Sequence, residues 1–162
     1  MTNEGIRMSS PTSPEEWREA QALVREYVEG LGVDLSFQQV DDEVERLSTV
    51  YAPPQAAFVW VHVDGALAGG GAWLPRPDAD HPNACEMRRL YVRRAFRRFG
   101  LGRLLAQALM DSALQAGFSC MLLDTLDDME AARGLYDSLG FEDIPPFYFN
   151  PLPGAHYLKV ML

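Results

Sequence analysis

The polar and apolar positions in the N-terminal part of the chain predict two helices. Ser13, Pro14 and the acidic pair that follows them form a capping sequence, so a helix is expected to begin there and to run to about Gly32. Residues 37–49 have the pattern of a second, acidic helix. A short strand is expected before both helices, over residues 5–8.

Three strands are predicted next. Residues 57–63 are apolar and partly β-branched or aromatic, Asp64-Gly65 is a hairpin signal, and the glycine-rich residues 66–74 return as the second strand. Residues 85–92 form the third strand. Because successive side chains of a strand point to opposite faces, this strand is expected to separate two sets of side chains. The sets are Glu86, Arg88 and Leu90 on one face and Met87, Arg89 and Tyr91 on the other.

The C-terminal half of the chain alternates helices with strands. Apolar residues recur at helical spacing over 101–116, and the apolar residues 120–123 are typical of a buried strand. A further helix, capped by Asp127 or Asp128, is expected to end at Gly140. Two final strands are expected near residues 141–149 and 156–162. This order predicts an α/β fold of the α+β type, with helices flanking a mixed, mostly antiparallel central sheet.

The composition fits a single domain over residues 1–162, of which 1–5 are expected to be flexible. The chain has 162 residues and is 48% hydrophobic, which is enough for one well-packed core. It has no apolar run of transmembrane length, and its start, MTNEGIRMSS, lacks the basic end and apolar core of a signal peptide. We therefore expect a cytoplasmic protein whose two cysteines, Cys85 and Cys120, are buried free thiols.

The charges are unevenly distributed along the chain. The formal net charge is -9, which disfavours nucleic acids and anionic membranes as partners. Residues 88–103 nevertheless contain seven arginines and no acid, while the rest of the chain holds all 23 acidic residues. We therefore expect any anionic ligand to bind locally, at this basic segment.

Within the basic segment, Arg97-Arg98-Phe99-Gly100-Leu101-Gly102 joins a predicted strand to a predicted helix. Free N–H groups at the start of the helix can converge on one anion, and the two glycines let the backbone approach it closely. A dinucleotide fingerprint fits less well, because Leu105 stands at its third glycine position, and the chain has no P-loop sequence. The alternative is that this basic segment at the start of the helix is simply exposed to solvent and binds no ligand.

Three segments accompany the R-x-x-G-x-G sequence formed by Arg97, Gly100 and Gly102. LYV precedes it, MLLDTL follows it, and AARGLYDSLGF lies in the next predicted helix. Together they resemble the acyl-CoA signature of the GNAT superfamily of N-acetyltransferases, strongly over residues 84–141. CEMRRLYV and NPLPGAHYL are similar to a group of small, mostly uncharacterised bacterial members. The resemblance implies the GNAT acyl-CoA N-acyltransferase fold and an enzyme that uses acetyl-CoA as donor and no metal.

The resemblance also implies which residues hold coenzyme A. The loop amides and Arg97 are expected to bind its pyrophosphate. The strand that ends at Val92 is expected to splay from residues 122–125, so that its backbone pairs with the pantetheine amides. The implied residues are Leu90, Tyr91, Val92, Arg97, Arg98, Phe99, Gly100, Leu101, Gly102, Arg103, Asp124 and Tyr136.

Acetyl transfer to an amine needs a base and an acid. An alkyl amine has a pKa of about 10.4 and is mostly protonated near neutrality, so a group must take its proton. Glu86 is the candidate base; an arginine ion pair or substrate binding are its alternative roles, and Asp124 is a second candidate. Tyr136 occupies the position at which the family places the acid that protonates the leaving thiolate. The resemblance implies direct attack in a ternary complex, without a cysteine nucleophile.

The acceptor is expected to be a primary amine of a small molecule or peptide. In the implied fold, the segments GLGVDLSFQQ and IPPFYFNPLPG lie over the amine side of the cleft. Candidate substrate-binding residues are Phe37, Glu86, Tyr148 and Asn150. The alternative function is a non-catalytic acyl-CoA-binding or regulatory module. The sequence leaves open whether the chain forms a homodimer.

Overall fold

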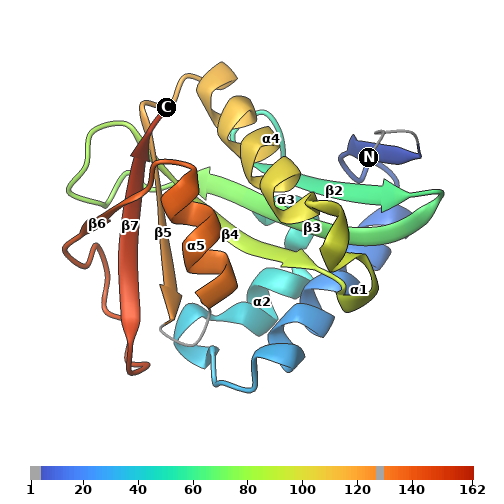
Figure 1. The fold of residues 1–162 in the computed structure, drawn as a ribbon, viewed down its shortest axis with the longest axis horizontal. Helices are drawn as coiled ribbons and strands as arrows, with labels where there is room; N and C mark the ends of the chain where they lie inside the picture. Colours follow the sequence, from blue (N-terminus) through green and yellow to red (C-terminus); the bar gives the residue numbers. More distant parts are fainter. Residues whose placement is uncertain (1–4, 127–129) are drawn as a thin grey trace.

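The computed structural model describes residues 5–126 and 130–162, and it places seven strands in one sheet (Figure 1). The strand order is β1-β2-β3-β4-β5-β7-β6. Neighbouring strands run antiparallel except β4 and β5, which are parallel. The predicted mixed, mostly antiparallel sheet is therefore confirmed. The strands are β1 (Ile6–Ser9), β2 (Ala57–Val63), β3 (Ala66–Pro75), β4 (Ala84–Val92), β5 (Cys120–Leu126), β6 (Glu142–Ile144) and β7 (Ala155–Met161).

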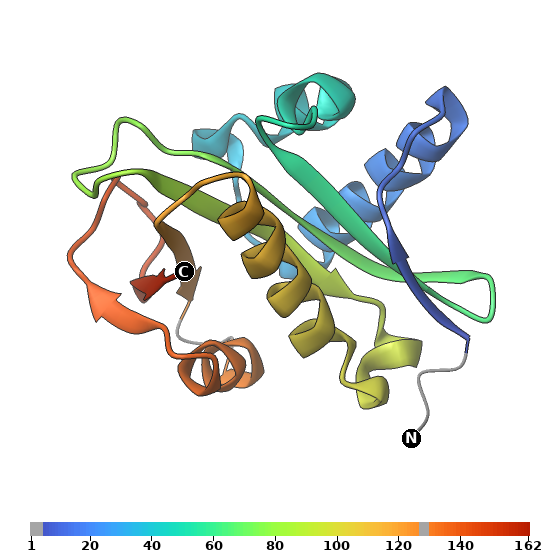
Figure 2. The same cartoon turned by 90° about the horizontal axis from the view of Figure 1, so that it is seen from above.

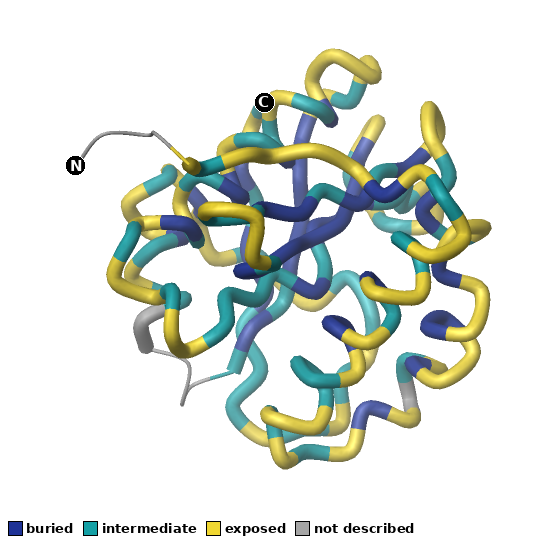
Figure 3. The backbone as a smooth tube through the Cα atoms, turned by 90° about the vertical axis from the view of Figure 1, so that its right-hand side faces the viewer, coloured by how far each residue is buried: buried dark blue, intermediate teal, exposed yellow. Residues whose placement is uncertain are grey.

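Helices cover both faces of this sheet. Figure 2 shows α1, α2 and α3 on one face and α4 and α5 on the other, and Figure 3 shows that the buried backbone lies mainly between these layers. None of the helices in the described part is both long and apolar enough to span a membrane. The helices are α1 (Pro14–Leu31), η1 (Ser36–Gln38), α2 (Val40–Glu45), α3 (Leu47–Val50), η2 (Arg94–Phe99), α4 (Leu101–Gln115) and α5 (Glu130–Ser138).

Several local predictions are confirmed. The Oγ of Ser13 accepts from the backbone N–H of Glu16 (3.1 Å), and the Glu16 side chain accepts from the backbone N–H of Ser13 (3.2 Å), so α1 begins with a capping box. Asp64 and Gly65 have φ angles of 50° and 84°, as a tight hairpin requires. The flexible start was predicted to include Gly5, yet its carbonyl oxygen accepts from the backbone N–H of Asp64 (2.8 Å).

Two predicted elements differ from the structure. Residues 37–49 form three short helices rather than one, because the chain turns at Gln39, where φ is 54°, and again at Arg46. The strand predicted over 141–149 ends at Ile144, since Pro145-Pro146 follows and proline lacks the N–H that a ladder needs. The predicted N-caps of the last helix, Asp127 and Asp128, lie outside the described residues.

The strands β4 and β5 diverge after three paired residues. Their parallel ladder ends at the pair Glu86 and Leu122, and the described residues pair no further between these strands. Each strand keeps its other neighbour: β4 pairs with β3 as far as Val92, and β5 pairs with β7 as far as Leu126. The predicted splay is confirmed, and it opens a gap inside the sheet.

A β-bulge lies in β4 beside this gap. Arg89 and Leu90 together stand opposite Gly71 of β3, and Arg89 has a φ of 60°, in the left-handed region. A Cβ atom on Gly71 would lie 3.2 Å from Leu90 Cδ1 and 2.9 Å from Leu109 Cδ1. Glycine at this position therefore leaves room for the bulged strand.

The bulge changes which face the side chains of β4 occupy. Arg88, Arg89 and Tyr91 all lie on the face of α1 and α2, where they contact acidic residues of those helices, whereas Leu90 packs against the face of α4. The predicted alternation along β4 is therefore wrong beyond Arg88. The extra residue of the bulge shifts the two-residue period by one position.

Candidate functional site

A cavity of about 850 Å³ opens where β4 and β5 diverge. Its walls come from both strands, α1 and the loop after it, η2, the start of α4, α5 and the loop before β7. Nine predicted site residues line the cavity: Glu86, Leu90, Tyr91, Val92, Arg97, Gly102, Asp124, Tyr136 and Asn150. The structure thus brings together residues from five separate segments of the chain, and we take this cavity as the candidate active site.

One end of the cavity lies at the start of α4. Gly100 precedes this helix with a φ of 69°, a conformation that glycine adopts at little cost. The first N–H groups of a helix have no partner within it, and Gly102, which carries one of them, lines the cavity. Arg94 and Arg97 of η2 line the same cavity. Free amides, the positive end of the helix dipole and two arginines are together suited to hold an anion, and we call this end the anion site.

Arg97 is oriented by the end of β4. Its Nε donates to the carbonyl oxygen of Val92 (2.8 Å), and its guanidinium carbon lies 5.9 Å from the ring centroid of Tyr91. The side chain is exposed, and a guanidinium has five N–H donors. Arg97 can therefore contact an anion while it keeps its contact with Val92.

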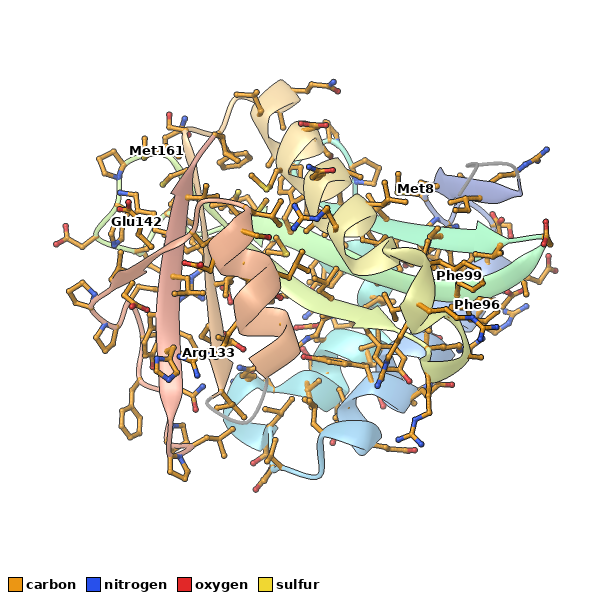
Figure 4. The ribbon with its side chains drawn as sticks, viewed as in Figure 1. Met8, Phe96, Phe99, Arg133, Glu142 and Met161 are labelled. Atoms are coloured by element: carbon orange, nitrogen blue, oxygen red, sulfur yellow. The ribbon has the colours of Figure 1, made fainter. Side chains whose placement is uncertain are left out.

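The other residues predicted for the anion site do not line the described cavity. They are Arg98, Phe99, Gly100, Leu101 and Arg103. Leu101 is fully buried, and Phe99 packs beside Phe96 at the start of α4, with ring centroids 6.4 Å apart (Figure 4). Arg103 donates to Ser138 Oγ. The side chains of Phe99, Leu101 and Arg103 are thus engaged within the protein rather than in the cavity.

The backbone of β4 forms one wall of the cavity. Leu90, Tyr91 and Val92 line it, and β4 pairs there with β3 alone. The backbone polar groups on the other edge of β4 therefore face the gap rather than a neighbouring strand. Such an edge can pair with an extended ligand that has amide groups of its own.

Glu86 stands at the point of divergence and is 2% exposed. Its Oε2 lies 3.1 Å from Arg88 Nε, and its Oε1 lies 3.5 Å from Arg76 Nε. Burial raises the pKa of Glu86 above its ordinary value, and the charges of the two arginines oppose this rise. The structure thus shows the arginine ion pair that the sequence analysis gave as an alternative role for Glu86. The role of Glu86 as a base stays a prediction.

Tyr136 reaches the cavity from α5. The residue is 8% exposed, and its ring packs against Phe141 at a centroid distance of 5.6 Å. Burial raises the pKa of the Tyr136 phenol, and the neighbouring Tyr27 and Asp124 raise it further. The hydroxyl therefore keeps its proton near neutral pH and is able to donate it.

Asp124 follows the divergence on β5, and two predicted acceptor-binding residues hold it. The hydroxyl of Tyr148 and the Nδ2 of Asn150 (2.8 Å) both donate to Asp124 Oδ2. Burial and the charge of Asp124 raise the pKa of Tyr148, so this hydroxyl stays a donor. The side chain of Phe37, the remaining acceptor prediction, lies outside the described part of the chain.

A polar network connects Asp124 to the bulge of β4. Gln38 Nε2 donates to the hydroxyl of Tyr148 (2.9 Å), and Gln38 Oε1 accepts from an Arg89 terminal nitrogen (2.7 Å). Arg89 donates twice to Glu43 (2.8 and 2.9 Å), and Arg88 donates to the same carboxylate (3.1 Å). Burial raises the pKa of Glu43, but the hydrogen bonds and charges of the two arginines outweigh it and hold the pKa below its ordinary value.

The sequence did not reveal several residues of this site. Arg94 and Tyr27 line the cavity, while Gln38 and Glu43 support its acceptor end. Arg94 was part of the arginine-rich segment, and Gln38 was part of the segment expected over the cleft. Glu43 had no local signal, because its partner Arg89 is 46 residues away.

Neither cysteine lines the cavity. Cys85 and Cys120 are buried and free, as predicted, and burial raises the pKa of Cys85 to about 12. A thiol with this pKa is protonated near neutrality and is a poor nucleophile. The described residues also contain no group of three or more His, Cys, Asp or Glu side chains placed to hold a metal ion.

Known proteins are similar to this chain in sequence. A family model, "Acetyltransferase (GNAT) family", matches residues 17–141. An uncharacterised N-acetyltransferase of Schizosaccharomyces pombe is 36% identical over 161 residues, which cover 99% of this chain and 97% of that protein. An uncharacterised N-acetyltransferase of Escherichia coli is 31% identical over 138 residues, which cover 85% of this chain and 81% of that protein.

Solved structures show the same fold at low sequence identity. An acetyltransferase of Streptococcus agalactiae aligns with a TM-score of 0.78 and 16% identity, covering 98% of this chain and 99% of that one. The protein yncA of Salmonella typhimurium, solved with its cofactor acetyl-CoA, aligns with a TM-score of 0.69 and 17% identity. The alignment covers 98% of this chain and 94% of that one.

Replacing Glu43 with Gln is expected to lower the free energy of unfolding by about 3 kcal/mol, because Arg89 keeps its buried charge and loses its anionic partner. Urea unfolding monitored by circular dichroism measures this change. Arg46→Ala is the matched control: it breaks an exposed ion pair with Asp42 (3.2 Å), which is worth less than about 1 kcal/mol. Equal losses of unfolding free energy in the two variants would contradict the role of Glu43 as the partner of a buried arginine charge.

The pH dependence of this loss has a definite sign. The folded pKa of Glu43 is held below its ordinary value of 4.5, so its stabilisation is present above pH 4.5 and is lost as the pH falls through the folded pKa. The difference in unfolding free energy between wild type and Glu43→Gln is therefore expected to narrow below pH 4.5. Repeating the urea series from pH 7 downward tests this, and a constant difference would argue against it.

Proposed function

This chain belongs to the acetyltransferase (GNAT) family, and on that basis we propose that it transfers an acetyl group from acetyl-CoA to a primary amine by direct attack within a ternary complex. The acceptor amine is carried by a small molecule or a peptide. One observation supports this proposal most directly. A single cavity has an anion site at one end, an open strand edge along its wall, and Glu86, Asp124 and Tyr136 beyond that edge.

The cavity fits the chemistry of acetyl-CoA. The amides at the start of α4, together with Arg94 and Arg97, match a pyrophosphate, and the open edge of β4 from Leu90 to Val92 matches the two amides of the pantetheine arm. When bound, acetyl-CoA supplies an acyl group activated as a thioester. The positive end of the cavity also matters because the chain carries a net charge of -9, which repels an anionic donor at long range.

Two carboxylates are candidates for taking the proton of the acceptor amine. Glu86 has a raised pKa, which suits a base that works near neutrality, and it lines the cavity. Asp124 lies across the gap on β5 and is the second candidate. We keep Glu86 as the proposed base, since the arginines that hold it also fix its position.

Tyr136 is the proposed acid. Tyr136 lines the cavity, and the raised pKa of its phenol means that it carries the proton that the leaving thiolate requires. Direct transfer needs no cysteine intermediate, and neither cysteine lines the cavity. The cytoplasmic location and the single domain over residues 1–162 stay predictions.

Acetyl-CoA consumption over a panel of amines, amino acids and peptides tests the proposed function. We expect acceptor-dependent release of the free thiol of coenzyme A with at least one primary amine. Calorimetric titration with coenzyme A gives its affinity in parallel. Tight binding without turnover on a broad panel would instead favour a non-catalytic acyl-CoA-binding module.

Tyr136→Phe is expected to lower kcat by roughly 100-fold or more while the Kd for coenzyme A stays within about twofold, because one proton donor is lost and no phosphate contact changes. Steady-state kinetics and calorimetry measure the two quantities. Tyr51→Phe serves as the control, since Tyr51 is fully buried and does not line the cavity. An unchanged kcat would remove Tyr136 from the mechanism.

Arg97→Ala is expected to weaken coenzyme A binding about fivefold, which corresponds to about 1 kcal/mol for one exposed charged contact. The loss should be largest at low salt and smaller at 0.5 M salt, where ions screen the charge. Calorimetric titrations at both salt concentrations measure it. Arg18→Ala makes the same change in net charge on an exposed residue of α1 and should leave binding unchanged; equal losses would overturn the anion site.

A further inference from the structure

The two carboxylates that line the described cavity differ in their partners. Glu86 forms ion pairs with Arg88 (3.1 Å) and Arg76 (3.5 Å). Asp124 forms no ion pair with any described basic residue. Its hydrogen bonds from the described residues come from an uncharged phenol and an uncharged amide. A carboxylate in a partly enclosed site without a cation lacks the compensation that such groups usually have.

The position of Asp124 is defined by its neighbours. Tyr148 and Asn150 both donate to Oδ2, and Gln38 in turn holds the Tyr148 hydroxyl. Oδ1 accepts no hydrogen bond from the described residues, so it is available to a ligand. The carboxylate is therefore held in place before any ligand binds, which lowers the ordering cost of binding a cation there.

Part of the cavity wall, on the side of α1 and of the loop before β7, is apolar. Leu31, Val33 and Leu35 line the cavity from the end of α1 and the loop after it, and Leu152 lines it from the loop before β7. Tyr27 adds an aromatic ring to the same lining. These side chains offer dispersion contacts and hydrophobic burial to an acceptor, and they provide no second acid.

The arginines at this end of the cavity already have anionic partners. Arg88 contacts Glu43 and Glu86, and Arg89 makes a two-point contact with Glu43. The other arginines of the described lining, Arg94 and Arg97, come from η2 at the anion end. Among the described lining residues, a carboxylate of the acceptor near Asp124 would therefore meet only arginines that already have an anionic partner.

From these observations we propose that the acceptor is a singly charged primary amine on an apolar carbon skeleton, and that Asp124 binds its ammonium group. This inference rests on the proposed function and specifies its substrate class. Asp124 acts in binding, and the proton is then lost from the bound ammonium to the base. The apolar wall has no second acid to bind the second ammonium group of a diamine. An α-amino acid has a carboxylate whose charge the site does not neutralise.

Two matched pairs of acceptors test the substrate class with the wild-type protein. Hexylamine is compared with 1,6-diaminohexane, and 2-phenylethylamine with phenylalanine, so each pair differs by one charged group. We expect kcat/KM to be at least tenfold higher for the singly charged amine of each pair. Equal values, or a preference for the doubly charged partner, would overturn the inference.

Asp124→Asn tests the residue. We expect at least a tenfold higher KM for 2-phenylethylamine, with a Kd for coenzyme A unchanged within twofold. Glu86→Gln, in contrast, is expected to lower kcat more than it raises this KM. Asp137→Asn is the matched control, because Asp137 is an exposed acid of α5 that does not line the cavity. An unchanged KM in Asp124→Asn, or an equal rise in Asp137→Asn, would overturn the role of Asp124.

The outcomes separate the two proposals. If no amine on the panel releases thiol, the proposed function fails and this inference fails with it. If amines are acetylated without the expected preferences, the function stands and the inference alone is wrong. The matched pairs need only the wild-type protein, so they decide the substrate class even if Asp124→Asn does not fold.

Discussion

Beyond Glu86 and Leu122, two neighbouring parallel strands of one sheet stop sharing hydrogen bonds, although each stays paired on its other side. Backbone polar groups turned toward such a gap need partners, because leaving one buried and unpaired costs about 1–3 kcal/mol. The structure places a cavity there instead of packing the gap with side chains. An extended ligand with amide groups along β4 would supply the missing partners, so the divergence of the strands determines where a donor can lie.

The bulge and a buried ion pair keep β4 in this position. Arg89 occupies the left-handed region at the bulge, and its side chain extends toward α2, where Glu43 binds it at two points. A buried pair contributes little net stability by comparison with apolar packing, but removing one partner is costly. Loss of either partner is therefore more costly than the pair itself is stabilising, and through Gln38 and Tyr148 the pair also connects the bulge to Asp124.

The features that sequence analysis predicted depend on residues close together in the chain. The capping box of α1 spans four residues, the turn at Asp64-Gly65 spans two, and the glycine loop before α4 is continuous. The bulge at Arg89 was not predicted, because it depends on space left by Gly71 and on an acid 46 residues away. The contact between Gln38 and Tyr148 joins residues 110 positions apart, and no local pattern reports such a pair.

Ion pairs in the folded protein neutralise part of the basic segment formed by residues 88–103. Of the seven arginines in residues 88–103, Arg88, Arg89 and Arg93 are paired with acids of α2, β4 and α1, so they do not add a free positive charge to the cavity. Arg94 and Arg97 keep the end near α4 positive. At the other end Asp124 carries a negative charge with no basic partner among the described residues. The cavity therefore has opposite charges at its two ends, which suits a reaction between an anionic donor and a cationic acceptor, since each reactant is attracted to its own end and repelled from the other.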